Sequence, residues 1–426
     1  MLNLMMNPWN LEISMSLLFF QSLPFILAFL LGLGLPRSFL LLFFIEAFCI
    51  WHAWHQNHER GNRFLTSLSI ALLCFGLSYV AAQIAWKVWL PIPDHLQEVL
   101  TAALLPALGL MGGWCLQRLN ATVISRKTIT LLIVTYGLGS LVYVLISLSL
   151  TQSPWWHWFD PVKQSVFVPW GSDHPLNMRS VEQRAYLILA CLPAAFILFN
   201  KQETRYRVMA WLLLLAFIGA LIATLAFQGR IGLLILFVSA LPWMTTLSLL
   251  GKRLNTLWVI LAMIGVLAFS GRGCDERLWL QLGFLGNVST APWGGRLIRF
   301  HYADCNPAIT NHFGSFAGSN ASSPHNVLLD IYNDAGIVPA MFMLIAISPI
   351  VVCVLRSFYI RYSLNLWDWH SAVRWALFST LLVEWLSQPL MYSDQLMYAI
   401  GFLYSGILLA EASDESEGAK PISLES

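Results

Sequence analysis

The sequence predicts an all-α membrane protein that crosses the bilayer about twelve times and carries one large outer loop with short amphipathic helices. Of its 426 residues, 58% are hydrophobic and 11% are charged, and the mean hydropathy is +0.66. Soluble domains are roughly 45–50% apolar and 25% charged, so that class is excluded. Apolar runs of about 20 residues, long enough to span a bilayer as helices, recur to about residue 410.

The apolar runs give the predicted membrane spans in chain order. They fall at about 13–35, 38–55, 64–86, 98–116, 128–150, 183–200, 208–227, 231–250, 255–271, 337–355, 371–390 and 393–410. Most connections between them are short and polar. Two connections are long, 151–182 and 272–336, and loops of this length on a helical scaffold commonly carry function.

The distribution of lysine and arginine predicts the orientation, because cytoplasmic loops are enriched in both. Alternate short loops hold Arg60 and Arg63, Arg118, Arg126 and Lys127, Lys201, Arg205 and Arg207, Lys252 and Arg253, and Arg356 and Arg361. These loops are predicted to be cytoplasmic, together with both termini, and the two long loops then lie on the opposite side. The acidic, serine-rich tail 411–426 is predicted to be disordered.

Seven cysteines are present, and only Cys274 and Cys305 lie outside predicted spans. Both are in loop 272–336. If this loop faces an oxidising compartment, a disulfide between them is plausible chemistry. No metal site is expected, because no CxxC pair accompanies them.

Three arginines that are predicted to lie at the outer face of the membrane are candidate phosphate ligands. Arg230 follows Gln228 and Gly229 between two apolar runs, where it either extends to water at the interface or binds a phosphate through its planar guanidinium. Arg296 and Arg299 lie three residues apart in the segment Trp293 to Phe300, so they share one helix face. They either meet anionic lipid head groups or hold one diphosphate.

The segment from Ser322 to Ile337 predicts a short helix before the tenth span. Ser323 is the expected N-cap, Pro324 the first helical residue and Gly336 the end. Its apolar face is expected to comprise Val327, Leu328 and Ile331.

His325 would then lie in the first turn of that helix. The positive end of the helix dipole would favour the neutral imidazole, which is the form that a general base requires. The alternative is an interfacial histidine that is merely hydrated.

These motifs together resemble the O-antigen ligase and polysaccharide polymerase superfamily of bacterial inner-membrane proteins. The resemblance rests on the Gly-Arg between two spans, the later Gly-Arg-Leu, and the His-Asn-x-x-Leu followed by Gly-Ile, and it covers about residues 208–356. Regions 1–207 and 357–410 agree with the family only as sets of transmembrane helices.

The resemblance implies a metal-independent, inverting glycosyltransferase that works at the periplasmic face without a cofactor. It would transfer a glycan from undecaprenyl pyrophosphate to an acceptor hydroxyl, on lipid A-core in a ligase or on a carrier-linked glycan in a polymerase. Arg230 and Arg296 match the diphosphate-binding arginines, with Arg299 as the competing assignment, and His325 matches the acceptor-activating histidine. Arg299, Asn326 and Trp293 are expected to contact substrate. Membrane lipids are the other expected partners, and nucleic acid is not one.

Ligase and polymerase need the same residues, so the motifs leave both open, with ligase favoured. A transporter for a lipid-linked sugar is the alternative from another class. A transporter would be expected to carry more charged pairs within its spans than this sequence does. Here Glu46, Arg374 and Glu384 are the main charges within spans. Glu384 is expected to face the bundle interior or a hydrated cavity, because a lipid-facing carboxylate is costly.

Overall fold

The structure, a computed structural model, is almost entirely helical. It describes residues 22–35, 38–55, 63–89, 96–120, 126–151, 185–226, 230–246, 281, 285, 292–294, 300–301, 320–321, 326–364, 367–387, 391 and 395–418. Within these stretches the only strands are β1 (Phe300–His301) and β2 (Asn320–Ala321), which pair antiparallel. The predicted all-α class is therefore confirmed.

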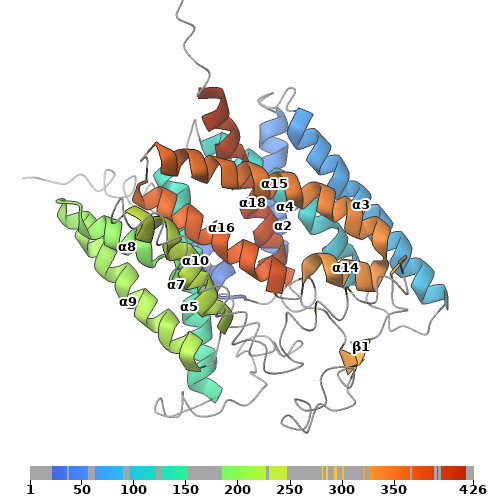
Figure 1. Cartoon of the computed structure of the whole chain (residues 1–426), viewed down its shortest axis with the longest axis horizontal. Coiled ribbons are helices and arrows are strands. Elements are labelled where there is room, and N and C mark those ends of the chain that lie inside the picture. The colour runs from blue at the N-terminus through green and yellow to red at the C-terminus, as the bar shows by residue number, and fades with distance from the viewer. Residues whose placement is uncertain are drawn as a thin grey trace, which may run out of the picture.

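The helices form one bundle, shown in Figure 1. In chain order they are α2 (Ser38–His55), α3 (Arg63–Trp89), α4 (Leu96–Asn120), α5 (Arg126–Thr151), α7 (Tyr186–Ala190), α8 (Leu192–Phe199), α9 (Thr204–Ala226), α10 (Arg230–Thr246), α14 (Val327–Ala335), α15 (Ile337–Ser363), α16 (Trp369–Ser387) and α18 (Gln395–Gly418). A shorter apolar helix covers Ser22–Gly32. Most of these helices coincide with predicted spans.

Six helices in the described part of the chain are long and apolar enough to cross a membrane. These segments are Phe64–Ala85, Val99–Arg118, Thr128–Leu150, Thr204–Ala226, Ile337–Ser363 and Gln395–Ser413. Large apolar side chains on their outer faces are exposed, among them Leu77 at 74% and Val352 at 64%. Exposed apolar surface on this scale suits contact with lipid, so the chain is a multi-pass membrane protein. The predicted span 255–271 lies outside the described residues.

The core is centred on α4 and α18, which pack against each other closely. Gly113 of α4 lies against the backbone of Leu403, and Gly406 of α18 lies against the carbonyl of Leu110, with no room for a side chain at either glycine. Small residues permit such close approach of two membrane helices. Helix α4 belongs to the predicted region 1–207, and most of α18 lies in the predicted region 357–410. The two regions therefore share one core.

The predicted span 183–200 is interrupted at Cys191. The amide of Cys191 donates to the carbonyl of Ile188 at 3.1 Å, three residues back rather than four. Pro193 follows and has no amide proton for the next helical bond. Helices α7 and α8 therefore replace the single predicted helix.

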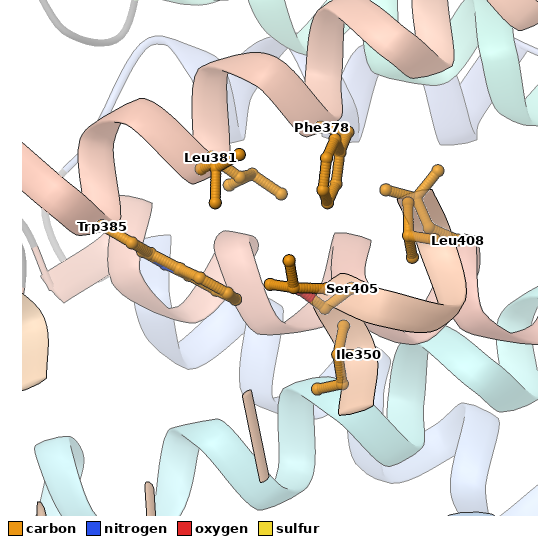
Figure 2. Close-up of a pocket in the computed structure, with 9 residues that line it drawn as sticks. Ile350, Phe378, Leu381, Trp385, Ser405 and Leu408 are labelled. Carbon is orange, nitrogen blue, oxygen red and sulfur yellow. The ribbon is translucent and has the colours of Figure 1, made fainter. Parts of the chain in front are cut away.

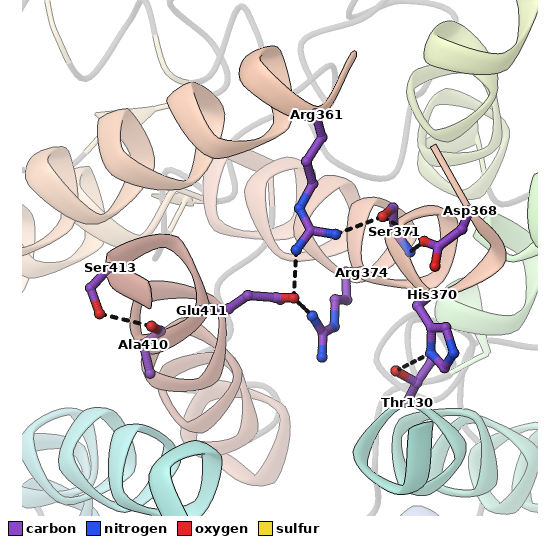
Figure 3. A network of polar contacts seen from close by, with 9 residues as sticks. All are labelled: Thr130, Arg361, Asp368, His370, Ser371, Arg374, Ala410, Glu411 and Ser413. Atoms are coloured by element: carbon purple, nitrogen blue, oxygen red, sulfur yellow. Dashed lines mark hydrogen bonds and ion pairs between the residues drawn. The ribbon is translucent and has the colours of Figure 1, made fainter. Parts of the chain in front are cut away.

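One end of the bundle is held by ion pairs, drawn in Figure 3. Arg361 of α15 and Arg374 of α16 both pair with the carboxylate of Glu411 on α18, the former at 2.7 Å. Arg361 also donates to the hydroxyl of Ser371 at 2.7 Å. We call Arg361, Ser371, Arg374 and Glu411 the ion-pair end.

The predicted disordered tail 411–426 is wrong in its first part. Helix α18 continues to Gly418, and Glu411 and Ala412 are buried. The reason is the position of Glu411 between two buried arginines, which a composition-based prediction does not detect. Residues 419–426 lie outside the described part of the chain.

Two further contacts join helix ends beside the ion-pair end. Arg118 near the end of α4 donates to Ser413 at 3.3 Å, and His370 at the start of α16 contacts Thr130 of α5 at 3.1 Å. These residues lie beside the ion-pair end. The opposite end carries α14 and, in Figure 1, β1.

Candidate functional site

Helix α14 begins at Asn326, three residues later than predicted. The backbone of Asn326 is extended, with φ −149° and ψ 125°, and its side-chain oxygen accepts the amides of Leu328 at 3.1 Å and Leu329 at 3.2 Å. Asn326 is therefore the N-cap, and the predictions of Ser323 as N-cap and Pro324 as first helical residue are wrong. Asparagine satisfies two free amides at once, which fixes the start of the helix here.

This start changes the expectation for His325. The residue lies outside the described part of the chain, and in the sequence it comes just before Asn326, the N-cap. The argument that a first-turn position favours the neutral imidazole is therefore lost. A role as base now rests on the motif alone.

The predicted end of α14 at Gly336 is confirmed. The amide of Gly336 donates to the carbonyl of Tyr332 at 3.0 Å, and α15 begins at the next residue. Gly336 has φ 99° and ψ −177°, a conformation that is open to glycine and strained for other residues. One residue thus joins the two helices.

The inner face of α14 is apolar with one acidic addition. Val327 and Ile331 are buried as predicted, and Leu328 is half-buried. Asp330 is also buried, and the helix packs mainly on α15 and α3. Amphipathic packing of this kind holds a short helix that would not be stable alone.

The last turn of α14 is bonded to α3 through Asp334. The carboxylate oxygen Oδ2 of Asp334 accepts from the hydroxyl of Tyr79 at 2.9 Å and from the amide of Gln83 at 2.5 Å. The same amide of Gln83 lies 3.4 Å from the backbone carbonyl of Asp334. Tyr79, Gln83 and Asp334 are the α3 contact of this helix.

Asn326, the N-cap of α14, is also bonded to α16. The side-chain amide of Asn326 lies 3.4 Å from the carbonyl of Leu386, and Gln281 donates to the same carbonyl at 2.6 Å. Asn326 is predicted to contact substrate, but its side chain is occupied here by the cap and by α16. It holds the helix in place, and a contact with substrate stays a prediction.

Residues 292–294 pack on the junction between α14 and α15. The carbonyl of Trp293 accepts the amide of Ile337 at 2.9 Å. Gly294 has φ +65°, and a side chain there would come within 2.6 Å of the carbonyl of Tyr332. Trp293 itself is 77% exposed, and its contact with substrate stays a prediction.

Tyr332 lies under this turn and is buried. Burial raises the pKa of its phenol. The phenol therefore stays neutral at physiological pH, and it is a hydrogen-bond donor rather than a base.

The other predicted site residues are described in part or not at all. Arg230 is the first residue of α10, but its side chain lies outside the described part of the chain. Four others lie entirely outside the described part of the chain: Arg296, Arg299, Cys274 and Cys305. Of the predicted residues, the structure thus brings Trp293 and Asn326 together around α14.

Sequence reasoning missed Tyr79 and Gln83. A usable signal exists, because Gln83 is an amide within an apolar span and Tyr79 lies four residues earlier, on the same helix face. The expectation for Glu384 is confirmed, since its side chain is fully buried in the bundle. No three histidine, cysteine or acidic residues in the described stretches are grouped to hold a metal ion.

A cavity between α15, α16 and α18 is drawn in Figure 2. It is lined by Ile350, Val351, Val354, Phe378, Leu381, Leu382, Trp385, Ser405 and Leu408. The hydroxyl of Ser405 already donates to the carbonyl of Gly401 at 2.8 Å. This lining suits neither phosphate nor sugar, and the surface around α14 remains the better candidate.

Comparison with known proteins adds no relative. No protein-family model matches the chain, and no curated protein matches it either. The resemblance of the motifs to the ligase and polymerase superfamily is therefore a hypothesis about this multi-pass membrane protein.

Proposed function

We propose that the chain is a metal-independent, inverting glycosyltransferase of the bacterial inner membrane, most simply an O-antigen ligase. The observation that carries the proposal is α14. The segment from Asn326 to Gly336, which follows His325 in the sequence, forms a capped helix that is bonded to α3 and α16 at one end of a multi-pass bundle. A fixed helix at the membrane surface is a suitable support for a group that must meet a lipid-linked substrate.

The proposed topology has about twelve spans, cytoplasmic termini and a periplasmic α14. Support comes from the grouping of the connections. Arg118, Arg361 and the start of the C-terminal tail meet at the ion-pair end, as expected of a cytoplasmic side rich in arginine. Asn326, Asp334 and Trp293 meet at the other end.

The proposed reaction needs two kinds of group. Arg230 and Arg296, or Arg299, would bind the diphosphate and stabilise its negative charge as the bond between the anomeric carbon and the phosphate oxygen breaks. His325 would take the proton from the acceptor hydroxyl as the new glycosidic bond forms. Attack opposite the leaving group inverts the anomeric centre. Undecaprenyl pyrophosphate is the leaving group.

Replacement of His325 by alanine in the native host tests the proposal, with surface polysaccharide separated on a gel. In a ligase, the ladder on lipid A-core is lost while long carrier-linked polymer is retained. In a polymerase, long chains are lost and a single repeat stays attached. An unchanged ladder would contradict the assignment of His325.

A matched pair of arginine variants tests the diphosphate site. Arg230→Ala should abolish the ladder, because Arg230 begins α10 where the donor is proposed to bind. Arg205→Ala is the control, since Arg205 lies near the start of α9, is 70% exposed and pairs only with Glu203 among the ion pairs described for it. Equal effects of the two variants would count against a specific role for Arg230.

A further inference from the structure

Helix α14 is held at both ends by different spans. Asn326, before its first turn, is bonded to α16, and Asp334, in its last turn, is bonded to α3. Two attachments on separate helices prevent both sliding and rotation of a short helix. Of these two attachments, the one through Asp334 is the stronger, with bonds of 2.9 and 2.5 Å against 3.4 Å.

The position of Asp334 is unfavourable for the helix itself. The C-terminal turn of a helix carries partial negative charge, so an aspartate there is destabilising unless other groups compensate. Tyr79 and Gln83 supply two donors to one carboxylate oxygen. The aspartate is thus explained by its contact with α3 and not by helix propensity.

The two donors are themselves fixed. Tyr79 is 2% exposed and its ring packs on Phe75 with centroids 5.6 Å apart. Gln83 is 8% exposed, and burying an amide in an apolar span is costly unless it is hydrogen-bonded. They lie one helical turn apart on α3, so a single rigid face of a membrane span presents both.

We infer that Asp334, through Tyr79 and Gln83, is a positioning residue that sets the orientation of α14 and thereby of the acceptor-activating group proposed at its start. The inference rests on the proposed function. It assigns Asp334 no contact with substrate and no proton transfer. The contact works through geometry, because both donors go to Oδ2 and an amide oxygen in the same place would accept both bonds.

This distinction sets the experiment. Wild type, Asp334→Asn, Asp334→Ala and the double variant Tyr79→Phe with Gln83→Leu are purified in detergent. Turnover is measured with a prenyl-pyrophosphate-linked oligosaccharide from the host as donor and host lipid A-core as acceptor. Ser78→Ala is the matched control on α3, since the hydroxyl of Ser78 bonds only within its own helix, to Phe75 at 2.9 Å, in the contact described for it.

The expected results separate positioning from mere stability. Per folded molecule, Asp334→Ala and the double variant should lower kcat about 10- to 100-fold with KM changed less than about twofold, as for a small misplacement of a reacting group. Asp334→Asn should stay within about fivefold of wild type, because charge-assisted bonds are only about twice as strong as neutral ones. Ser78→Ala should be unchanged.

Two results would overturn the inference. One is normal kcat per folded molecule in Asp334→Ala. The other is an asparagine variant as inactive as the alanine variant, which would show that the charge of Asp334 matters and not its geometry.

Failure of the proposed function is a different outcome. It would appear as equal turnover by wild type and His325→Ala, and it would remove the catalytic meaning of the contact. Hydrogen exchange of peptide 326–336 would still report whether Asp334→Ala loosens α14.

Discussion

The two ends of the bundle are held by different chemistry. At the ion-pair end, two arginines share the carboxylate of Glu411, and all three side chains are largely buried. At the α14 end, the carboxylate of Asp334 is met by an uncharged hydroxyl and an uncharged amide. Neutral donors fix a helix without placing a cation beside it.

The comparison predicts that the ion-pair end is the more sensitive to loss of one partner. Glu411→Ala should lower the free energy of unfolding by about 3–5 kcal/mol, because it leaves the buried guanidinium of Arg374 and the half-buried one of Arg361 without their carboxylate. Thermal unfolding in detergent measures this. Ser413→Ala, on the same helix, loses the bond from Arg118 at 3.3 Å and the donation of Ser413 to the carbonyl of Ala410 at 2.8 Å, and it should cost about 1 kcal/mol. Equal losses would show that the ion pairs do not dominate this end.

Loss of the N-cap should have a smaller effect at the other end. Asn326→Ala removes the acceptor of two amides and the contact with Leu386, so it should cost about 1–2 kcal/mol. Asn326→Asp retains the acceptor and should restore most of the stability. If aspartate fails to do so, the amide donation to α16 matters more than the cap.

Low pH should weaken the ion-pair end through Asp368, which lies beside it. Partial burial works to raise the pKa of this carboxyl, but hydrogen bonds from Ser371 and the nearby His370 and Arg361 charges outweigh it and hold the pKa below the ordinary value of 3.8. The stabilisation is therefore complete above about pH 4 and is lost as the pH falls through the lowered pKa.

The measurement is the melting temperature of wild type and Asp368→Asn between pH 7 and pH 3. The variant should melt slightly lower at pH 7, since Asp368 is exposed and its contribution is small. The difference between the two curves should shrink as the pH falls below about 4. A constant difference over this range would assign the effect to something other than ionisation of Asp368.

The smallest effect is expected at an exposed ion pair outside both ends. Arg205 and Glu203 are 2.6 Å apart, but their side chains are 70% and 57% exposed. Glu203→Gln should leave the melting temperature almost unchanged, and added salt should reduce even that small change. A larger loss would mean that exposure is a poor guide to the strength of ion pairs in this protein.

Local patterns predicted the helices well and their contacts poorly. Apolar runs identified the spans, and Gly336 gave the end of α14 correctly because the glycine conformation is a local property. The start of α14 was wrong because Ser323, Pro324 and Asn326 are all acceptable helix starts in sequence. The choice among them depends on Leu386, which is 60 residues away from Asn326.

The contacts of Glu411 and Asp334 were not predictable for the same reason. Arg361 and Glu411 are 50 residues apart, and Tyr79 and Asp334 are 255 apart. Composition described the region after residue 410 as a polar tail, and only the folded bundle provides the two arginines that keep its first turns helical. Pairings over such distances require knowledge of which spans are neighbours.

The single residue between α14 and α15 also restricts how the protein can diversify. An insertion at Gly336 would break the contact of Trp293 with Ile337 and detach α14 from its membrane anchor. Changes in chain length are therefore tolerable only upstream of Asn326, in the long outer loop. Under the proposed function, relatives that accept different glycans would be expected to vary upstream of Asn326 while the distance from Asn326 to α15 stays constant.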